Sequence, residues 1–202
     1  MKKYFILLAG SPGTGKTYLM NKLRERFPDM YAITLDEIKE YYAESIGFNN
    51  LEERAEQERT KVYPFYYKAL DLYMEAGKTE YPFSDKQKAR LQELADRYGY
   101  QVITIRLTAD FEVLWQRRYK RDRESDRHLS YIMDHYHYGD VLEDRTKGTN
   151  HITKEAFKKI IADRKYDKFQ LGTLYEFDVT DYTQVDYTPL LDKLEKEIND
   201  NK

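Results

Sequence analysis

The sequence predicts an α/β protein in which a parallel sheet carries helices on both faces. Short apolar runs alternate along the chain with segments whose apolar residues recur at helical spacing. Chains that alternate in this way build parallel sheets with right-handed crossovers. A glycine-rich loop at residues 10–17 joins the first apolar run to the first helical segment. Because ligands of such sheets bind at the carboxyl ends of the strands, we expect the functional site there.

The glycine-rich loop fits the phosphate-binding pattern G-x-x-x-x-G-K-[ST]. Its residues are Gly10, Ser11, Pro12, Gly13, Thr14, Gly15, Lys16 and Thr17, and Tyr18 follows in the helix. The glycines allow a tight bend, so that successive backbone N–H groups form an anion nest at a helix N-terminus. We expect Lys16 to reach the terminal phosphates of a nucleotide and the Thr17 hydroxyl to bind Mg²⁺.

Length, charge and cysteine content limit the class of protein. The 202 residues suit a single domain over 1–202, with a helical insertion at about 48–76 and a lid at about 122–140. The net charge of −2 gives no global bias toward nucleic acid or a membrane surface, and no apolar stretch is long enough to span a membrane. The absence of cysteine excludes disulfides and is compatible with the cytoplasm, where we expect the protein.

Five strands are expected, at residues 4–9, 31–35, 79–83, 100–107 and 174–179. The third is short and contains Pro82, and Ser84 to Gln87 behind it match a capping box. Residues 50–76 allow two interpretations, a solvated helical hairpin or an insertion that covers the substrate. Residues 122–140 are polar, lack a core pattern and are predicted to form a mobile loop or lid.

Asp36 follows the second expected strand and is the candidate for contact with the acceptor. Its carboxylate would accept the proton of an acceptor hydroxyl or orient that hydroxyl for in-line attack. The competing interpretation is structural, because Thr34-Leu35-Asp36-Glu37 resembles a capping box at a helix start.

Arginines gather at the end of the helix expected at residues 111–121. Arg117 and Arg121 are four residues apart and share one helix face, and Arg127 follows in the expected lid. They are candidates to hold the transferring phosphate, and the alternative is a solvated basic run. The histidines at 128, 135 and 137 have no matching acid or cysteine pattern, which argues against a metal site.

The chain resembles the P-loop kinases and the small AAA-type ATPases, and it is similar in plan to zeta toxins and polynucleotide 5′-hydroxyl kinases. The resemblance covers most of the chain. It rests on residues 10–17, on Asp36-Glu37, on residues 80–84, on Arg117-x-x-x-Arg121-Asp122 and on Arg127-His128. It implies a P-loop NTPase three-layer sandwich with a five-stranded sheet in the order 2-3-1-4-5. It also implies that the acid after the second strand faces the hydroxyl acceptor and that lid arginines hold the phosphate.

The leading hypothesis is an ATP-dependent kinase that phosphorylates a hydroxyl of a small-molecule or nucleotide-like acceptor, with ATP and Mg²⁺ as cofactors. A zeta-type sugar-nucleotide kinase and an RNA 5′-hydroxyl kinase are alternatives among enzymes. Nucleic acid is not favoured as a partner, because the chain is slightly acidic. A nucleotide-binding switch without transfer activity is the alternative from another class. No N-K-x-D guanine motif is present, which disfavours a GTPase switch.

Overall fold

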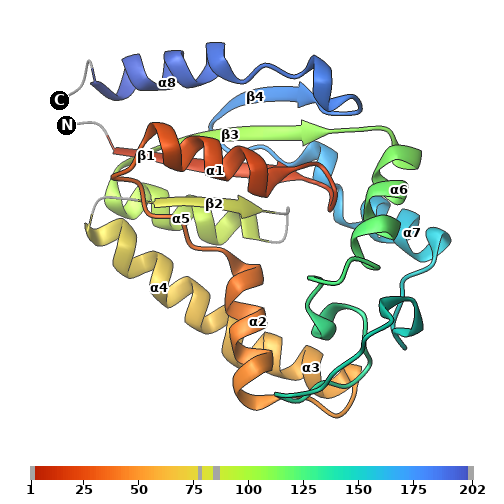
Figure 1. The fold of residues 1–202 in the computed structure, drawn as a ribbon. Helices are drawn as coiled ribbons and strands as arrows, with labels where there is room; N and C mark the ends of the chain where they lie inside the picture. The colour runs from red at the N-terminus through yellow and green to blue at the C-terminus, as the bar shows by residue number, and fades with distance from the viewer. Residues whose placement is uncertain (1–2, 77–78, 84–86, 200–202) are drawn as a thin grey trace.

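The protein folds around a four-stranded parallel sheet (Figure 1). The structure is a computed structural model that describes residues 3–76, 79–83 and 87–199. The strands are β1 (Lys3–Gly10), β2 (Thr79–Phe83), β3 (Tyr100–Thr108) and β4 (Thr173–Asp178), in the order β2-β1-β3-β4. All three neighbouring pairs run parallel, as expected for strands that helices connect.

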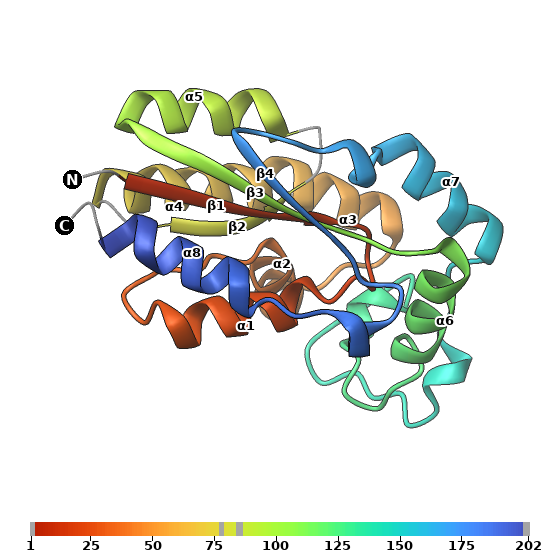
Figure 2. The same ribbon diagram turned by 90° about the horizontal axis from the view of Figure 1, so that it is seen from above.

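Helices cover both faces of the sheet, with α1 and α8 on one face and α4 and α5 on the other (Figure 2). The helix α6 and the segment after it lie beyond the carboxyl end of β3, and α2 and α3 extend away from the sheet (Figure 1). The helices are α1 (Lys16–Arg26), α2 (Leu35–Ile46), α3 (Leu51–Gln57), α4 (Tyr63–Ala76), α5 (Lys88–Tyr98), α6 (Phe111–Arg121), α7 (Lys154–Arg164) and α8 (Thr188–Asn199). Within the described residues, no helix is both long and apolar enough to cross a membrane.

Residues 31–35 do not form the second strand that the sequence predicts. Only Ala32 makes a β-bridge, and α2 begins at Leu35. The Thr34 side chain accepts a hydrogen bond from the backbone N–H of Glu37 and caps the helix, which ends the extended segment. The five-strand order 2-3-1-4-5 is therefore not formed by the described residues, although the four strands present keep the order expected among them.

Two apolar clusters, one on each face of the sheet, form the core. Phe5 and Leu7 of β1 pack toward α4 and α5, whereas Ile6 and Leu8 pack toward α1 and α8. The alternation follows from the strand, in which successive side chains point to opposite faces. The run is apolar throughout because helices cover both faces. The strand β2 contains Pro82, which an edge strand tolerates, because within the described residues no strand pairs with its other side.

The solvated hairpin, one of the two interpretations of residues 50–76, describes α3 but not α4. No residue of α3 is buried, but Tyr66, Leu70 and Met74 of α4 are buried in the core beside α5. The helix α4 includes Pro64 as its second residue. It directly follows a π-helical turn, η1 (Glu58–Val62), a feature that occurs where the regular α-helical hydrogen-bond pattern is interrupted. The α4 helix is therefore a layer of the sandwich rather than a solvated hairpin.

The segment at residues 122–140 has a core of its own, contrary to the sequence prediction. Leu129, Ile132 and Tyr136 are buried together with Ala43 of α2 and Phe48. Phe48 and Tyr136 also exchange two backbone hydrogen bonds of 2.8 Å. Three apolar residues in a polar segment show no core pattern by themselves, because their packing partners lie some 90 residues earlier in the chain. The expected capping box at residues 84–87 falls mostly on residues 84–86, which lie outside the described residues.

Candidate phosphate-transfer site

The loop between β1 and α1 has a backbone conformation that glycine adopts easily and other residues do not. Gly10 has a φ angle of 144°, and Gly15, the N-cap of α1, has a φ angle of 79°. A Cβ on Gly10 would lie 2.5 Å from the carbonyl oxygen of Leu107 in β3. No side chain caps α1, so the first backbone N–H groups of this helix remain available to an anion.

The Lys16 side chain folds back over the loop. Its ammonium donates hydrogen bonds to the carbonyl oxygens of Gly10 and Ser11, at 2.7 and 3.0 Å. Burial lowers the pKa of Lys16 from 10.5 to about 8, the carboxylate of Asp36 opposes this shift, and Arg121 adds to it. Asp36 of α2 and Arg121 of α6 therefore both lie within electrostatic reach of the Lys16 ammonium.

Thr17 and Tyr18 begin the first turn of α1 and are exposed to solvent. An exposed hydroxyl directly after the phosphate-loop lysine fits a magnesium ion that also binds phosphate oxygens. Elsewhere in the described part of the chain, no group of three or more His, Cys, Asp or Glu side chains is arranged to hold a metal ion. The predicted Mg²⁺ ligand Thr17 is therefore accessible to an ion beside the loop.

Both interpretations of Asp36 have support in the structure. Thr34 caps α2 by accepting from the backbone N–H of Glu37, and Asp36 lies in the first helical turn, as the structural interpretation expects. The Asp36 carboxylate also acts on the charge of Lys16, as the functional interpretation expects. The hydroxyl of Tyr131 approaches the backbone carbonyl of Asp36 at 3.5 Å and brings the segment after α6 next to this position.

Arg117 binds backbone oxygens on both sides of the phosphate loop. Its guanidinium donates hydrogen bonds to the carbonyl oxygen of Thr180 at 2.9 Å and to that of Gly13 at 3.4 Å. It also lies 3.6 Å from the centre of the Tyr182 ring, and the Tyr182 hydroxyl donates to Gly13 at 2.9 Å. Arg117 thus ties α6 and the turn after β4 to the loop. Sequence analysis missed Thr180 and Tyr182, although they follow a strand whose carboxyl end faces the site.

Arg121 and Arg127 meet at one buried carboxylate, which sequence analysis named in a motif but gave no role. The Asp122 side chain is 4% exposed. One of its oxygens accepts a hydrogen bond from Arg118 Nε at 3.0 Å, and the other lies 3.1 Å from Arg127 Nε and 3.9 Å from Arg121 Nε. Burial and the neighbouring Arg121 lower the pKa of Arg127, while Asp122 raises it. The predicted lid arginines are therefore brought together, and Arg117 stands apart from them.

The segment after α6 is fastened to α2 by a second carboxylate that sequence analysis missed. Glu44 accepts hydrogen bonds from the Tyr136 hydroxyl at 2.6 Å and from His128 Nε2 at 2.8 Å. These two bonds lower the pKa of Glu44, the Tyr136 bond contributing most. Tyr131 lies closer to the phosphate loop, with its ring 3.9 Å from the guanidinium carbon of Arg127. The segment therefore covers the side of α2 on which Asp36 lies.

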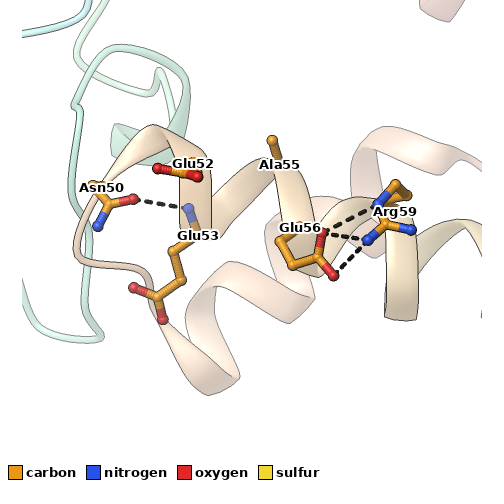
Figure 3. A pocket seen from close by; sticks show the side chains of 6 residues that line it. All are labelled: Asn50, Glu52, Glu53, Ala55, Glu56 and Arg59. Atoms are coloured by element: carbon orange, nitrogen blue, oxygen red, sulfur yellow. Dashed lines mark hydrogen bonds and ion pairs between the residues drawn. The ribbon is translucent and has the colours of Figure 1, made fainter.

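A surface hollow of about 620 Å³ lies on α3, apart from the phosphate loop (Figure 3). It is lined by Asn50, Glu52, Glu53, Ala55, Glu56 and Arg59. Its polar groups bond to one another, since Asn50 accepts from the Glu53 backbone N–H at 2.8 Å and Arg59 pairs with Glu56 at 2.6 Å. None of the predicted site residues lines this hollow, and we assign it no part in the site.

A family model and solved structures match the chain. The profile of the zeta toxin family matches residues 1–168. No curated protein sequence matches the chain.

Solved structures share this fold over the whole chain. A candidate kinase from Chloroflexus aurantiacus J-10-fl superposes with a TM-score of 0.74 at 18% identity, covering 100% of this chain and 98% of that one. Shikimate kinase from Bacteroides thetaiotaomicron has a TM-score of 0.54 at 15% identity and covers 97% and 98%. A gluconokinase from Sinorhizobium meliloti 1021 has a TM-score of 0.53 at 12% identity and covers 99% and 98%. At these identities the likeness shows the α/β fold of the P-loop kinases.

Proposed function

The chain belongs to the zeta toxin family, and from that premise we propose that it is a kinase. In this proposal it transfers the γ-phosphate of ATP, in the presence of Mg²⁺, to a hydroxyl group of a small-molecule or nucleotide-like acceptor. The family membership and the P-loop kinase fold support phosphotransfer in general, and the site residues support the more specific reaction.

One observation carries the proposal, namely the two groups that act on the Lys16 ammonium from different elements. Asp36 of α2 and Arg121 of α6 both affect the pKa of Lys16. A phosphate-loop lysine with a carboxylate and an arginine within electrostatic reach matches the needs of phosphoryl transfer, which are positioning and charge neutralisation. A nucleotide switch without transfer activity has no need of a carboxylate at the acceptor side.

Each site residue then has a role that suits its position. The backbone N–H groups of residues 10–17 and the Lys16 ammonium hold the phosphates, and the Thr17 hydroxyl binds Mg²⁺, which neutralises phosphate charge when bound. Arg121 and Arg127 stabilise the charge that develops on the transferred group. Asp36 accepts the proton of the acceptor hydroxyl or orients that hydroxyl for in-line attack. Arg117 fixes the loop through the contacts to Gly13 and Thr180.

The acceptor class is supported by the fold neighbours and by the segment after α6. The neighbours include a shikimate kinase and a gluconokinase. In this chain the segment after α6 packs on α2 and brings the Tyr131 hydroxyl next to the Asp36 backbone, which favours a small or nucleotide-like acceptor over a bulky one. A sugar nucleotide and the 5′-hydroxyl of an RNA remain the named alternatives.

The test is to titrate the protein with ATP by calorimetry and then to follow the γ-phosphate. The protein is incubated with γ-labelled ATP, Mg²⁺ and fractionated metabolite pools, with a nucleoside diphosphate-sugar and a 5′-hydroxyl oligoribonucleotide as separate acceptors. We expect label on one small-molecule fraction, and none with Lys16→Ala, whose fold should be intact because Lys16 contacts loop carbonyls rather than core. ATP binding with no transfer to any fraction would favour the switch, and label from Lys16→Ala at the wild-type rate would contradict the loop assignment.

A further inference from the structure

We propose that Asp122 is a positioning residue that aims Arg121 and Arg127 at the transferred phosphate. This inference rests on the proposed kinase function and deepens it. Asp122 directly follows α6, and its buried carboxylate contacts three guanidinium groups. Two of these arginines belong to α6, and Arg127 comes from the segment beyond it, so one carboxylate sets the relative position of both elements.

The location of Asp122 is costly, which argues for a role beyond fold stability. The C-terminal end of a helix carries the negative end of the helix dipole, and a carboxylate there is disfavoured. Burial disfavours it further, because a buried charge is tolerated only when it is paired. Asp122 is nonetheless the C-cap residue of α6 and is 3% exposed. The positive charges of Arg118, Arg121 and Arg127 offset the cost of burying this carboxylate.

The charges in this cluster do not balance. One carboxylate faces three guanidinium groups, so two positive charges remain when the cluster is considered by itself. Arg118 makes the hydrogen bond to Asp122, at 3.0 Å, and its guanidinium lies 5.3 Å from the Phe157 ring of α7. The excess charge therefore lies on Arg121 and Arg127, the two that a phosphate group would neutralise.

The path from Asp122 to the phosphate loop is short. One turn before Arg121, Arg117 donates to the carbonyl oxygen of Gly13, and the Cβ of Arg117 lies 3.6 Å from where a Gly13 Cβ would be. Arg121 is on the same helix face and influences Lys16. Arg118 thus anchors Asp122 from the core side, and Asp122 holds Arg121 and Arg127 toward the loop.

The competing explanation is that Asp122 only ties the lid segment to α6. The two explanations predict different nucleotide affinities. A structural tie, when broken, would weaken ATP and ADP binding alike. A positioning residue would affect ATP selectively, because Arg121 and Arg127 are placed for the γ-phosphate that ADP lacks.

The experiment compares the dissociation constants of Mg·ATP and Mg·ADP for the wild type and for Asp122→Asn, by calorimetry. We expect Asp122→Asn to bind ATP about tenfold more weakly, because the variant loses the charge that pairs with Arg127 and Arg121, and to bind ADP as the wild type does. In the transfer assay, kcat should fall while the KM for ATP rises by no more than the measured loss of affinity. In an Arg121→Gln, Arg127→Gln background, Asp122→Asn should have little further effect on ATP binding.

A matched control is Asp71→Asn, which removes a carboxylate that also pairs with an arginine, Arg97 at 3.1 Å, and with the Tyr98 hydroxyl. It should leave the ratio of the two affinities unchanged. Equal losses of ATP and ADP affinity in Asp122→Asn, including complete loss through misfolding, would overturn the positioning role. An unchanged ratio of ATP affinity to ADP affinity in Asp122→Asn would also overturn the positioning role. If the wild type itself does not bind ATP, or if Lys16→Ala binds it equally well, the proposed function fails rather than this inference.

Discussion

Lys16 holds its positive charge at neutral pH in an environment that disfavours it. Burial lowers its pKa to about 8, although two loop carbonyl oxygens and the Asp36 carboxylate stabilise the ammonium. Since the unfolded chain binds this proton more tightly than the folded chain, Lys16 lowers the stability of the free protein at neutral pH. That contribution disappears only as the pH rises through the interval from about 8 to 10.5. In the proposed function, bound phosphate groups would offset this destabilisation.

The lowered pKa of Lys16 leads to a prediction about proton uptake when a nucleotide binds. Bound phosphates should raise the pKa of Lys16, so nucleotide binding should be accompanied by proton uptake between about pH 8 and 9 and by almost none from Lys16 at pH 7. Calorimetry in buffers of different ionisation enthalpy measures the uptake. Lys16→Ala should show none at pH 8.5, and its free form should melt no lower than the wild type at pH 7. Uptake that is the same in both proteins would assign the proton to another group.

For Asp36 we predict an effect of substitution on kcat that is separate from any effect on stability. Asp36→Asn keeps the size of the side chain, and the cap of α2 depends on Thr34, so the melting temperature should change little. A carboxylate that acts on the acceptor hydroxyl should lose roughly 10²-fold or more in kcat on this change, with ATP affinity preserved. Glu37→Gln, which removes the neighbouring charge in the same helical turn, is the control. A near-normal kcat for Asp36→Asn, measured with the true acceptor, would remove Asp36 from the mechanism.

At the scale of elements, α6 carries arginines with two different tasks. Arg117 faces the backbone of the phosphate loop and the turn after β4, whereas Arg121 faces Lys16 and shares Asp122 with Arg127. Both lie on one helix face, four residues apart, so one helical turn separates the arginine that binds the loop from the arginine proposed to contact the phosphate.

The two arginines should therefore differ in kinetic effect. Arg121→Ala should lower kcat by roughly 10²-fold with a smaller loss of ATP affinity, because its contact strengthens as charge develops in the transition state. Arg117→Ala should mainly weaken ATP binding, because it loosens the loop. Arg123→Ala is a suitable control, since Arg123 stacks on Tyr119 at 3.5 Å and bonds to the same residue. Equal and small effects of all three would favour a solvated basic run.

At the scale of the whole molecule, the site is assembled where parts distant in sequence meet. The sheet and α1 supply the phosphate loop, α2 supplies Asp36, and the segment after α6 closes over them through Glu44, His128 and Tyr136. The hydrogen bonds to Glu44 lower its pKa, so their stabilising effect is fully present above the usual glutamate range. It is lost as the pH falls through the lowered value.

Glu44→Gln should therefore loosen this closure at pH 7. We expect lower protection factors for amide hydrogen exchange at residues 129–136 in the variant at pH 7, while the wild type should reach comparably low protection only in acid, below the usual glutamate range. Glu53→Gln, whose side-chain bonds stay within residues 49–57, should leave this exchange unchanged. Identical exchange in the Glu44 variant and the wild type would show that the buried residues of this segment alone hold it on α2.

The sequence by itself determined the phosphate loop, the α/β class and most helix and strand positions. Each of these depends on residues close together in the chain, such as the glycines before Lys16, the apolar run of β1 and the capping Asn50 of α3. Local conformational preference and local burial patterns are enough to specify such features.

The tertiary structure alone decided the rest, because burial and pairing between distant segments cannot be read from local pattern. Residues 31–35 have the composition of a strand, but capping by Thr34 starts a helix instead. The polar segment after α6 acquires a core from Ala43 and Phe48. Asp122 looks like one more charge in a basic run until α6 and Arg127 enclose it, and only the enclosure makes its carboxylate a common partner of three arginines.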